Sequence, residues 1–503
     1  MKIGGIDVGT SGCKLTVYDV YENECRFLNN EYREYNVSRC EGNHEIDAKE
    51  IFEAVCDIIR VSYKLYPDIE AIGITTFGET FVLLDENDDV LLPSMLYTDP
   101  RGQTEALELC EKIGSEKIMN TAGAMPDKMY SLPKLMWIRK NRPDIWARVR
   151  RVLLMEDYIT YMLTGNAVID YSLAARTLGL DIRKKCWSRE IFEAAEINTE
   201  LMSHPVKAGF IAGNIRDDVA KSLKISSKIK IAAGCHDQAA AAVGAGVFTV
   251  GEAVDGTGTV ECVTPMFNKI PENTKLYEMG YTVVPYVFDN TYVCYALSFT
   301  GGAALKWFRD NFAEYDSILA RENGKNVYAE LDDKMPDKPT DILVMPHFSG
   351  AANPYMDSRS KAAVIGLTFE HTKYDLYRAL MEGATYEIMV NIECLESFGI
   401  HIKKLIATGG GAASEEWLKI KADILGRTII SLYAKEAGTC GTCMITAAAV
   451  GACKDLDEAR RIFVREKNVY MPETEDAEKY KKNYKAYKRI YKAACSVTEV
   501  LYE

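Results

Sequence analysis

The sequence lacks the motifs that mark several common nucleotide and metal sites. It contains neither GxxxxGK[ST] nor GxGxxG, which excludes a P-loop and the usual dinucleotide fingerprint. Only six histidines are present and no HExxH occurs, so little is available for a zinc centre. The net charge is -13, without long blocks of like charge. A nucleic-acid partner, whose phosphates demand a basic face, is therefore not expected.

The sequence also has no long apolar run, and no leader segment is expected. The longest run of small apolar residues, 239–247, is too short to span a bilayer, and the first residues, MKIGGIDVGT, enter a strand-like pattern directly. Fourteen cysteines are scattered through the chain, which favours reduced thiols in a cytoplasmic protein over a disulfide framework. Cys440 and Cys443 form one CxxC among small residues, a setting that favours packing over a redox or metal role.

A pattern of strand, glycine-threonine turn and strand occurs twice in the chain. It is first seen in GIDVGTSGCKLTVYD, from residue 5, and again in GEAVDGTGTVECV, from residue 251. After the first hairpin, a further strand near 25–31 and a helix over 48–65 give the alternation of an α/β layer. The repetition predicts an α/β protein with two lobes, related by internal duplication, and a cleft between them.

The boundary between the expected lobes lies in a glycine-rich stretch. We place the lobes at 1–246 and 247–503, with a hinge near 244–251. The second lobe is expected to end in an amphipathic helical tail. Its tyrosines recur at helical spacing and form one stripe, which predicts a packing face: Tyr480, Tyr484, Tyr487 and Tyr491.

Each glycine-threonine turn is a candidate phosphate site. Glycine lets backbone N–H groups come close to phosphate oxygens, and the hydroxyls of Thr10, Ser11 and Thr257 can add donors. One such turn is most often a simple hairpin. Two of them facing one cleft are stronger evidence for a nucleotide site.

Asp237 stands in GCHDQAAAAVGAGV, between a glycine-flanked turn and an alanine-rich stretch that is typical of a buried helix. An aspartate at a helix start can accept hydrogen bonds as an N-cap. The alternative is a catalytic base at the mouth of a cleft. The stretch by itself allows both roles.

Over almost its whole length the chain resembles the FGGY carbohydrate kinases of the actin-like, ribonuclease-H-like ATPase superfamily. The first hairpin is similar to the family's first phosphate hairpin, and GCHDQAAAAVGAGV to its GxxDxxxAxxG. Two further stretches match the family signatures, MYSLPKLMWIRKN at 129–141 and AAVIGLTFEHTKYDLYRALME at 362–382. GTGT, TGGAALKW and TGGGAASEEWLKIKADILG resemble the family's nucleotide-binding elements.

The resemblance implies roles for the candidate residues. Asp237 would be the general base that takes the proton of the attacking sugar hydroxyl, Asp7 would hold Mg²⁺ through its waters, and Lys14 would lie near the β- or γ-phosphate of ATP. Alternatives are a turn-capping Asp7 and a solvent-facing Lys14. ATP contacts are implied for Thr10, Ser11, Gly12, Gly256, Thr257, Gly258, Gly302, Gly410, Gly411 and Ala412, although tight turn packing would also explain the glycines.

The substrate side gives mixed indications. Glycerol kinases carry Arg-Glu, and xylulokinases Met-His, where this chain has Gly78 and Glu79. Glu79 can accept hydrogen bonds from sugar hydroxyls, and Gly78 is expected to leave room where arginine would stand, which favours a substrate larger than glycerol. Gln238, however, continues Asp237 as in glycerol kinases.

Two nearby stretches complete the predicted substrate side. In YTDPRG, Asp99 and Arg101 either shape the sugar site or form an internal ion pair. DYSLAARTLGLD, at 170–181, is expected to give structural support.

These residues predict transfer of the γ-phosphoryl group of ATP, with Mg²⁺, to a hydroxyl of a sugar or polyol. A ketopentose such as xylulose or ribulose is favoured, and glycerol, erythritol or a deoxyketose are alternative acceptors. An ATP-driven binding or assembly protein of the same superfamily is the alternative from another class. We expect a cytoplasmic protein, possible as a homodimer, with neither a nucleic-acid nor a membrane partner.

Overall fold

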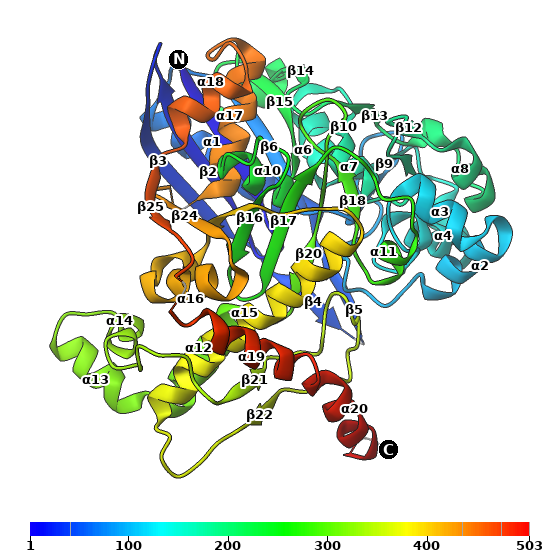
Figure 1. The fold of residues 1–503 in the computed structure, drawn as a ribbon. Helices are drawn as coiled ribbons and strands as arrows, with labels where there is room; N and C mark the ends of the chain where they lie inside the picture. The colour runs from blue at the N-terminus through cyan, green and yellow to red at the C-terminus, as the bar shows by residue number, and fades with distance from the viewer. Residues whose placement is uncertain (41, 435, 474, 502–503) are drawn as a thin grey trace.

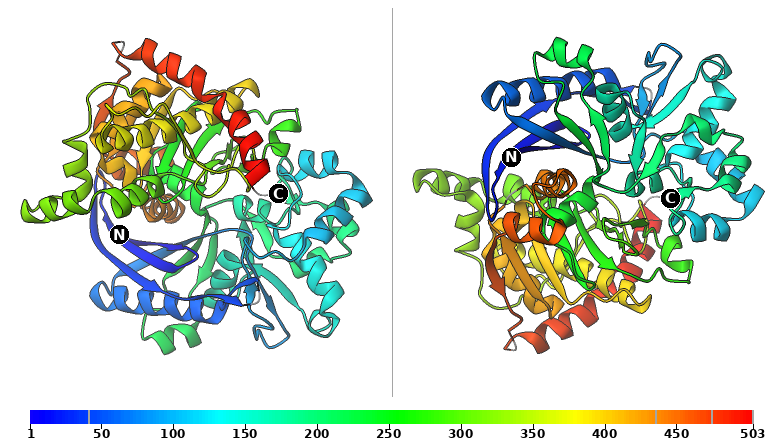
Figure 2. Two further views of the ribbon diagram at one scale, coloured as in Figure 1. Left: turned by 90° about the horizontal axis from the view of Figure 1, so that it is seen from below. Right: turned by 90° about the horizontal axis from the view of Figure 1, so that it is seen from above.

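The computed structural model describes residues 1–40, 42–434, 436–473 and 475–501. They form two large β-sheets with helices around them (Figure 1). Figure 2 shows the same chain from two opposite sides, with the blue N-terminal sheet and the yellow-to-red C-terminal elements in separate masses. No helix within the described ranges is both long and apolar enough to cross a membrane.

The N-terminal sheet has the strand order β14-β15-β6-β1-β2-β3. The first three strands form an antiparallel meander, whereas β6 and β15 run parallel to β1. The strands are β1 (Lys2–Val8), β2 (Gly12–Val20), β3 (Cys25–Glu34), β6 (Ile69–Thr76), β14 (Ile211–Asn214) and β15 (Lys230–His236). Helix α1 (Ala48–Leu65) begins after the cap Asp47 and packs on β2 and β3. It covers the residues predicted for it.

The C-terminal sheet has the order β18-β19-β17-β16-β23-β24-β25, and β20 also pairs with β17. Its strands are β16 (Glu252–Thr257), β17 (Glu261–Phe267), β18 (Val283–Pro285), β19 (Tyr292–Cys294), β20 (Ala296–Ser298), β23 (Lys404–Thr408), β24 (Thr428–Leu432) and β25 (Glu466–Tyr470). As in the first sheet, an antiparallel hairpin is followed by a strand parallel to its first member, since β23 is parallel to β16. Both predicted glycine-threonine hairpins are therefore present.

Smaller elements extend the N-terminal half. Its short strands are β4 (Val37–Cys40), β5 (Asn43–Ile46), β7 (Phe81–Leu84), β8 (Ser94–Met95), β9 (Arg151–Leu154), β10 (Val168–Asp170), β11 (Leu180–Asp181), β12 (Cys186–Trp187) and β13 (His204–Val206). Its further helices are α2 (Gln103–Ile113), α3 (Ser115–Ala122), α4 (Ser131–Asn141), α5 (Pro143–Trp146), α6 (Met155–Thr164), α7 (Tyr171–Ala175), α8 (Arg189–Ala195), η1 (Thr199–Leu201) and α9 (Asp217–Leu223).

The C-terminal half adds helices around its sheet. They are α11 (Lys275–Glu278), α12 (Gly302–Phe312), α13 (Glu314–Glu322), α14 (Val327–Asp332), α15 (Lys373–Ser397), η2 (Gly410–Ala413), α16 (Glu415–Leu425) and α18 (Leu456–Phe463). A separate two-stranded sheet joins β21 (Leu343–Met345) to β22 (Ala363–Ile365).

Two small-residue helices join the halves at the centre of the molecule. Helix α10 (Asp237–Gly244) packs on α17 (Ala437–Val450), and α17 also lies against β1 and β6 of the first sheet. A methyl group on Gly244 would come within 1.9 Å of the Ala437 carbonyl oxygen, so only glycine allows this approach. Cys440 and Cys443 are both buried in α17 as free thiols, in agreement with the packing role expected for the CxxC.

The tail forms α19 (Ala477–Tyr487) and α20 (Ile490–Leu501). Tyr480, Tyr484 and Tyr487 are buried, and the Tyr487 hydroxyl donates to the Glu387 carboxylate at 2.5 Å. The tyrosine stripe is therefore a packing face, as predicted. A turn at 488–489 interrupts the helix before Tyr491.

Candidate active site

Asp237 lies where β15 ends and α10 begins. It is the first helical residue, and His236 stands at the cap position, so the N-cap expectation is wrong by one residue. The Asp237 carboxylate still accepts a hydrogen bond from the backbone N–H of Gln238, at 2.6 Å. About a third of the side chain, 31%, is exposed. One oxygen of this carboxylate is therefore held by a backbone hydrogen bond, while part of the side chain is open to a ligand.

Burial, together with the negative charges of Asp7 and Glu79, raises the pKa of Asp237 to about 8, against the opposing effect of Arg176. The effects of Asp7 and Glu79 show that the predicted metal-binding and sugar-binding carboxylates lie within electrostatic reach of the predicted base. A carboxylate with a pKa near the working pH is suited to accept a proton during a reaction.

Asp7 is the penultimate residue of β1, opposite Lys14 of β2 in the hairpin register. Burial raises its pKa to about 6, against the effect of Lys14. The Lys14 ammonium is bound by the Glu436 carboxylate at 2.6 Å, with a quarter of the lysine side chain exposed. Lys14 is therefore not simply solvent-facing, because it links the first hairpin to the start of α17.

The first turn itself is tightly built. The Gly9 N–H donates to the Gly12 carbonyl oxygen at 2.9 Å, Thr10 is partly exposed and Ser11 is exposed. The two hydroxyl residues can therefore be reached by a ligand. Their contact with phosphate remains a prediction.

Among the described residues, no group of three or more His, Cys, Asp or Glu side chains could hold a metal ion. Magnesium, however, commonly takes only one or two protein carboxylates and completes its shell with water and substrate phosphates. Asp7 fits that arrangement, because the residue is partly exposed and burial raises the pKa of its carboxylate, so that a nearby cation would favour the charged form.

Glu79 lies between β6 and β7 and has a left-handed backbone, with φ of 63°. Non-glycine residues seldom adopt this conformation, and such strain is concentrated at functional sites. The Glu79 carboxylate pairs with the Arg176 guanidinium, and both side chains are only 6% exposed. The Ser131 hydroxyl also holds the Glu79 carbonyl oxygen at 2.6 Å.

The expectation that Gly78 leaves room for a substrate is wrong. A methyl group built on Gly78 would lie 2.9 Å from Cγ of Arg176 and 3.1 Å from Cδ2 of His236. The space next to Gly78 is therefore already filled by protein. Arg176 enters it from the end of α7, in the stretch for which only structural support was expected.

Aromatic side chains enclose Arg176. Its guanidinium lies over the Tyr130 ring at 5.2 Å and the Tyr295 ring at 5.6 Å. The Tyr295 hydroxyl lies 2.9 Å from Nδ1 of His236, and burial lowers the pKa of His236 well below its usual value. Because Tyr295 belongs to the C-terminal half, both halves contribute to the surroundings of Arg176.

Asp99 and Arg101 form the internal ion pair that sequence reasoning allowed. The Arg101 guanidinium binds Asp99 at 2.7 Å and also Glu45 at 2.6 Å, and Asp99 is fully buried. Lys134 is also fully buried and feels the charges of both Asp99 and Glu79. The pair is therefore close enough to support the sugar side, although direct contact with a sugar remains a prediction.

A cavity of about 530 Å³ lies in the C-terminal half, beside the second hairpin. Five predicted nucleotide residues line it: Thr257, Gly258, Gly302, Gly410 and Gly411. Gly256 and Ala412 are adjacent in sequence but are not in its wall. Leu305, Tyr328, Tyr377 and Trp417 give the cavity an apolar side that suits a purine ring.

Sequence reasoning missed a buried charge cluster beneath the second hairpin. The Lys421 ammonium donates to Asp255 at 2.6 Å, Glu261 at 2.6 Å and the Thr257 hydroxyl at 2.7 Å, and all four residues are buried. Lys421 was part of the quoted TGGGAASEEWLKIKADILG. Its signal was a lysine on the otherwise apolar face of α16.

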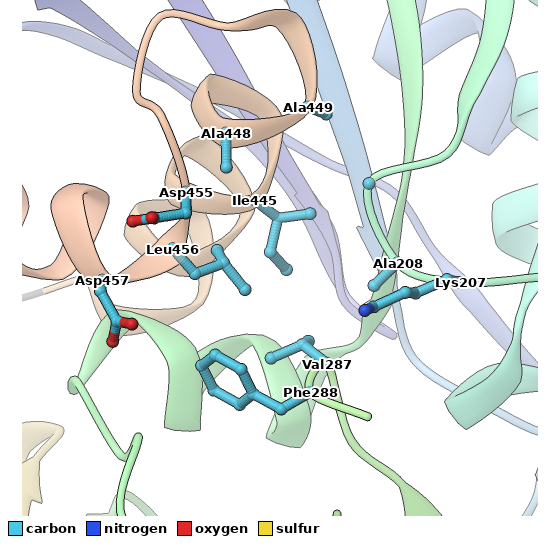
Figure 3. A pocket seen from close by; sticks show the side chains of 11 residues that line it. Lys207, Ala208, Val287, Phe288, Ile445, Ala448, Ala449, Asp455, Leu456 and Asp457 are labelled. Carbon is cyan, nitrogen blue, oxygen red and sulfur yellow. The ribbon is translucent and has the colours of Figure 1, made fainter. Parts of the chain in front are cut away.

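A second cavity, of about 380 Å³, lies between the halves on another side (Figure 3). Lys207 and Ala208 approach it from the N-terminal half, while Phe288, Ile445 and Leu456 face it from the C-terminal half. None of the predicted site residues lines it.

Comparison with known proteins identifies the class. Residues 2–244 match the N-terminal domain, and residues 258–450 the C-terminal domain, of the FGGY family of carbohydrate kinases. The chain belongs to this family. Its membership, with the two-lobed structure, confirms the predicted actin-like α/β fold and sugar phosphotransferase activity and does not favour the assembly-protein alternative.

Individual relatives share nearly the full length. A xylulose kinase of Lactococcus lactis subsp. lactis (strain IL1403) is 27% identical, over 99% of this chain and 98% of its own. A xylulose kinase of Bacillus subtilis (strain 168) is 26% identical, over 97% and 96%. A crystal structure of a xyloylose kinase from Brucella ovis superposes with a TM-score of 0.87 at 26% identity, covering 99% of this chain and all of that one.

Proposed function

We propose that the protein is an ATP-dependent ketopentose kinase acting on xylulose or a close relative such as ribulose. The names of its full-length relatives support this substrate class. The observation that carries the proposal is the partly exposed Asp237 carboxylate, with a pKa near 8, beside the buried Glu79–Arg176 pair.

Asp237 acts as the base. As the sugar hydroxyl oxygen bonds to the γ-phosphorus, the bond from that phosphorus to the bridging oxygen breaks, and the hydroxyl proton passes to the Asp237 carboxylate. The hydrogen bond from the Gln238 N–H fixes the carboxylate while this occurs. Alignment of the hydroxyl and the phosphate accounts for most of the catalysis in such transfers.

The nucleotide occupies the cavity beside the second hairpin, with its base against Trp417 and Tyr377 and its phosphates toward Thr257 and Gly258. Thr10, Ser11 and Gly12 approach the terminal phosphate from the first hairpin, and Lys14 adds positive charge. Asp7 would hold Mg²⁺, which would supply further positive charge beside the transferred group. Both hairpins then hold one nucleotide.

Glu79, Gln238 and the Asp99–Arg101 pair form the sugar side. Polar side chains that bind a hydroxyl discriminate strongly against substrates lacking it, because an unpaired buried group is costly. A shorter polyol would leave some of these polar groups unpaired, so the site should bind a ketose more tightly.

The function is tested by ADP release in a coupled assay over D-xylulose, L-xylulose, D-ribulose, L-ribulose, glycerol and erythritol. We expect turnover to require a ketopentose and Mg²⁺. Turnover with glycerol alone would place the protein among the polyol kinases. ADP release that no sugar or polyol changes would contradict the proposal.

A homodimer and a cytoplasmic location are further parts of the proposal. Light scattering at micromolar concentration tests the first, since a monomeric mass would contradict it. Fractionation of cells that express the protein tests the second.

A further inference from the structure

We propose that Arg176 is a substrate-binding residue that replaces, from a different segment, the side chain that Gly78 lacks. The inference rests on the proposed function and extends it to the recognition of the sugar. It concerns a residue for which the sequence indicated only structural support.

The position of Arg176 is the first argument. Gly78 and Arg176 are far apart in sequence, but the β- and γ-carbons of Arg176 occupy the volume that a side chain at position 78 would need. The guanidinium then reaches Glu79, the neighbour of Gly78. An arginine and a glutamate therefore stand side by side although the sequence places a glycine before the glutamate.

The hydrogen bonding of the guanidinium is the second argument. Nε and Nη2 of Arg176 both bind Oε1 of Glu79. Nη1 of Arg176 is buried and has no partner. Buried donors are almost always paired, so an unpaired one indicates a ligand or a water that completes it. An oxygen of the bound sugar satisfies Nη1, and Oε2 of Glu79 accepts a hydroxyl of the same sugar.

A second buried arginine offers a direct comparison with Arg176. Arg378 pairs with Glu382 in α15, with side chains 6% and 0% exposed, much like the Arg176–Glu79 pair. Its remaining nitrogens are both used, since Nη1 donates to the Pro336 carbonyl oxygen and Nη2 to the Tyr480 hydroxyl, each at 2.8 Å. All three side-chain nitrogens of Arg378 therefore have a partner, whereas Nη1 of Arg176 has none.

The charges around Arg176 and Glu79 indicate whether the sugar is neutral or acidic. The positive Arg176 and the negative Glu79 cancel, and the Tyr130 and Tyr295 rings lie against the guanidinium. A sugar acid would bring a further carboxylate next to those of Glu79 and Asp237, which lie within electrostatic reach of each other. The pair therefore selects an uncharged ketose. D-Xylonate, which has the carbon chain of D-xylulose and a carboxylate, should bind at least tenfold more weakly.

The experiment compares the KM for the ketopentose of highest turnover in Arg176→Gln, Arg176→Lys, Gly78→Ala and the unmodified protein. Loss of a charge-assisted hydrogen bond should raise the KM of Arg176→Gln about 10- to 100-fold and leave the KM for ATP within about twofold. Gly78→Ala should act in the same direction, since its methyl group displaces Arg176. Arg176→Lys keeps the charge, and its KM for the ketopentose should lie between those of the unmodified protein and Arg176→Gln.

Arg378→Gln is the matched control for the loss of a buried arginine. It should lower the unfolding temperature as Arg176→Gln does, but leave the KM for sugar unchanged. An unchanged sugar KM in Arg176→Gln, or an equal rise in Arg378→Gln, would overturn the role of Arg176. Equal binding of D-xylonate and D-xylulose would overturn the charge-balance argument. Absence of turnover in the unmodified protein would instead contradict the proposed function.

Discussion

The two glycine-threonine hairpins have similar backbones but opposite electrostatics. In the first, Asp7 makes no salt bridge within the described chain, and the nearby Lys14 is bound to Glu436. In the second, Asp255 and Glu261 share the buried Lys421. The first hairpin therefore has negative charge that a bound cation can balance, whereas the second is balanced by the protein.

This difference separates two tasks. The second hairpin is a rigid part of the nucleotide cavity, because Lys421 pairs with its carboxylates and also donates a hydrogen bond to the hydroxyl of Thr257, which lines the cavity. In the first hairpin, where Asp7 has no such lysine partner, a bound cation would change the balance of charge. In the second hairpin burial raises the pKa of Glu261 to about 8, and one of its oxygens has no partner. The raised pKa favours the protonated form of Glu261, in which the charge of Asp255 alone balances that of Lys421.

The largest expected effect is the loss of turnover when Asp237 is replaced. Asp237→Asn should lower kcat by about 10²- to 10⁴-fold, because the base is lost, with little change in nucleotide affinity. Steady-state kinetics and nucleotide titration measure both quantities. Asp289→Asn, at an exposed residue paired with Lys207, is the control and should be neutral. Near-normal turnover of Asp237→Asn would remove it from the mechanism.

Breaking the internal support should act on stability. Lys421→Met leaves Asp255 buried without its partner, which should cost about 3–5 kcal/mol of unfolding free energy. Denaturant unfolding measures this loss. Glu261→Gln is the control: it should cost much less, because burial favours the uncharged form of Glu261. Equal losses in both variants would show that Glu261 is ionised and that the cluster carries net negative charge.

The pH dependence comes next. The raised pKa of Asp237, about 8, means that the carboxylate is mostly protonated, and inactive as a base, below that pH. The value of kcat/KM should therefore rise roughly tenfold per pH unit below about pH 7 and level off near pH 8. A profile that is flat between pH 6 and 8 would contradict the assignment.

The smallest effect contrasts the hairpins directly. Asp7→Asn should raise the Mg²⁺ concentration for half-maximal rate by about tenfold, because one charged ligand of the metal shell is lost. Asp255→Asn should leave that concentration unchanged while lowering stability. The same Mg²⁺ requirement in both variants would show that the hairpins do not divide the tasks as described.

Local patterns predicted much of the fold. The period of the apolar residues gave the bounds of α1, and the glycine-threonine turns gave both hairpins. Asp237 was placed correctly at the start of a helix, although the glycine-flanked turn expected before it is the end of strand β15. These features depend on neighbours in sequence, which a single chain displays.

Contacts between distant segments were not predictable in the same way. Glu79 and Arg176 are 97 positions apart, and Asp255 and Lys421 are 166 apart. No local period records that such residues meet. The error at Gly78 arose in this way: the missing side chain suggested empty space, whereas Arg176, at the end of the distant helix α7, fills it.

The packing of α17 on β1 and β6 has a consequence for dividing the chain. Although each half repeats the same strand order, the N-terminal half would lose the cover of one sheet face if it were produced alone, and its apolar strands would meet water. A separately expressed N-terminal half is therefore expected to be poorly soluble unless residues 437–450 are supplied with it.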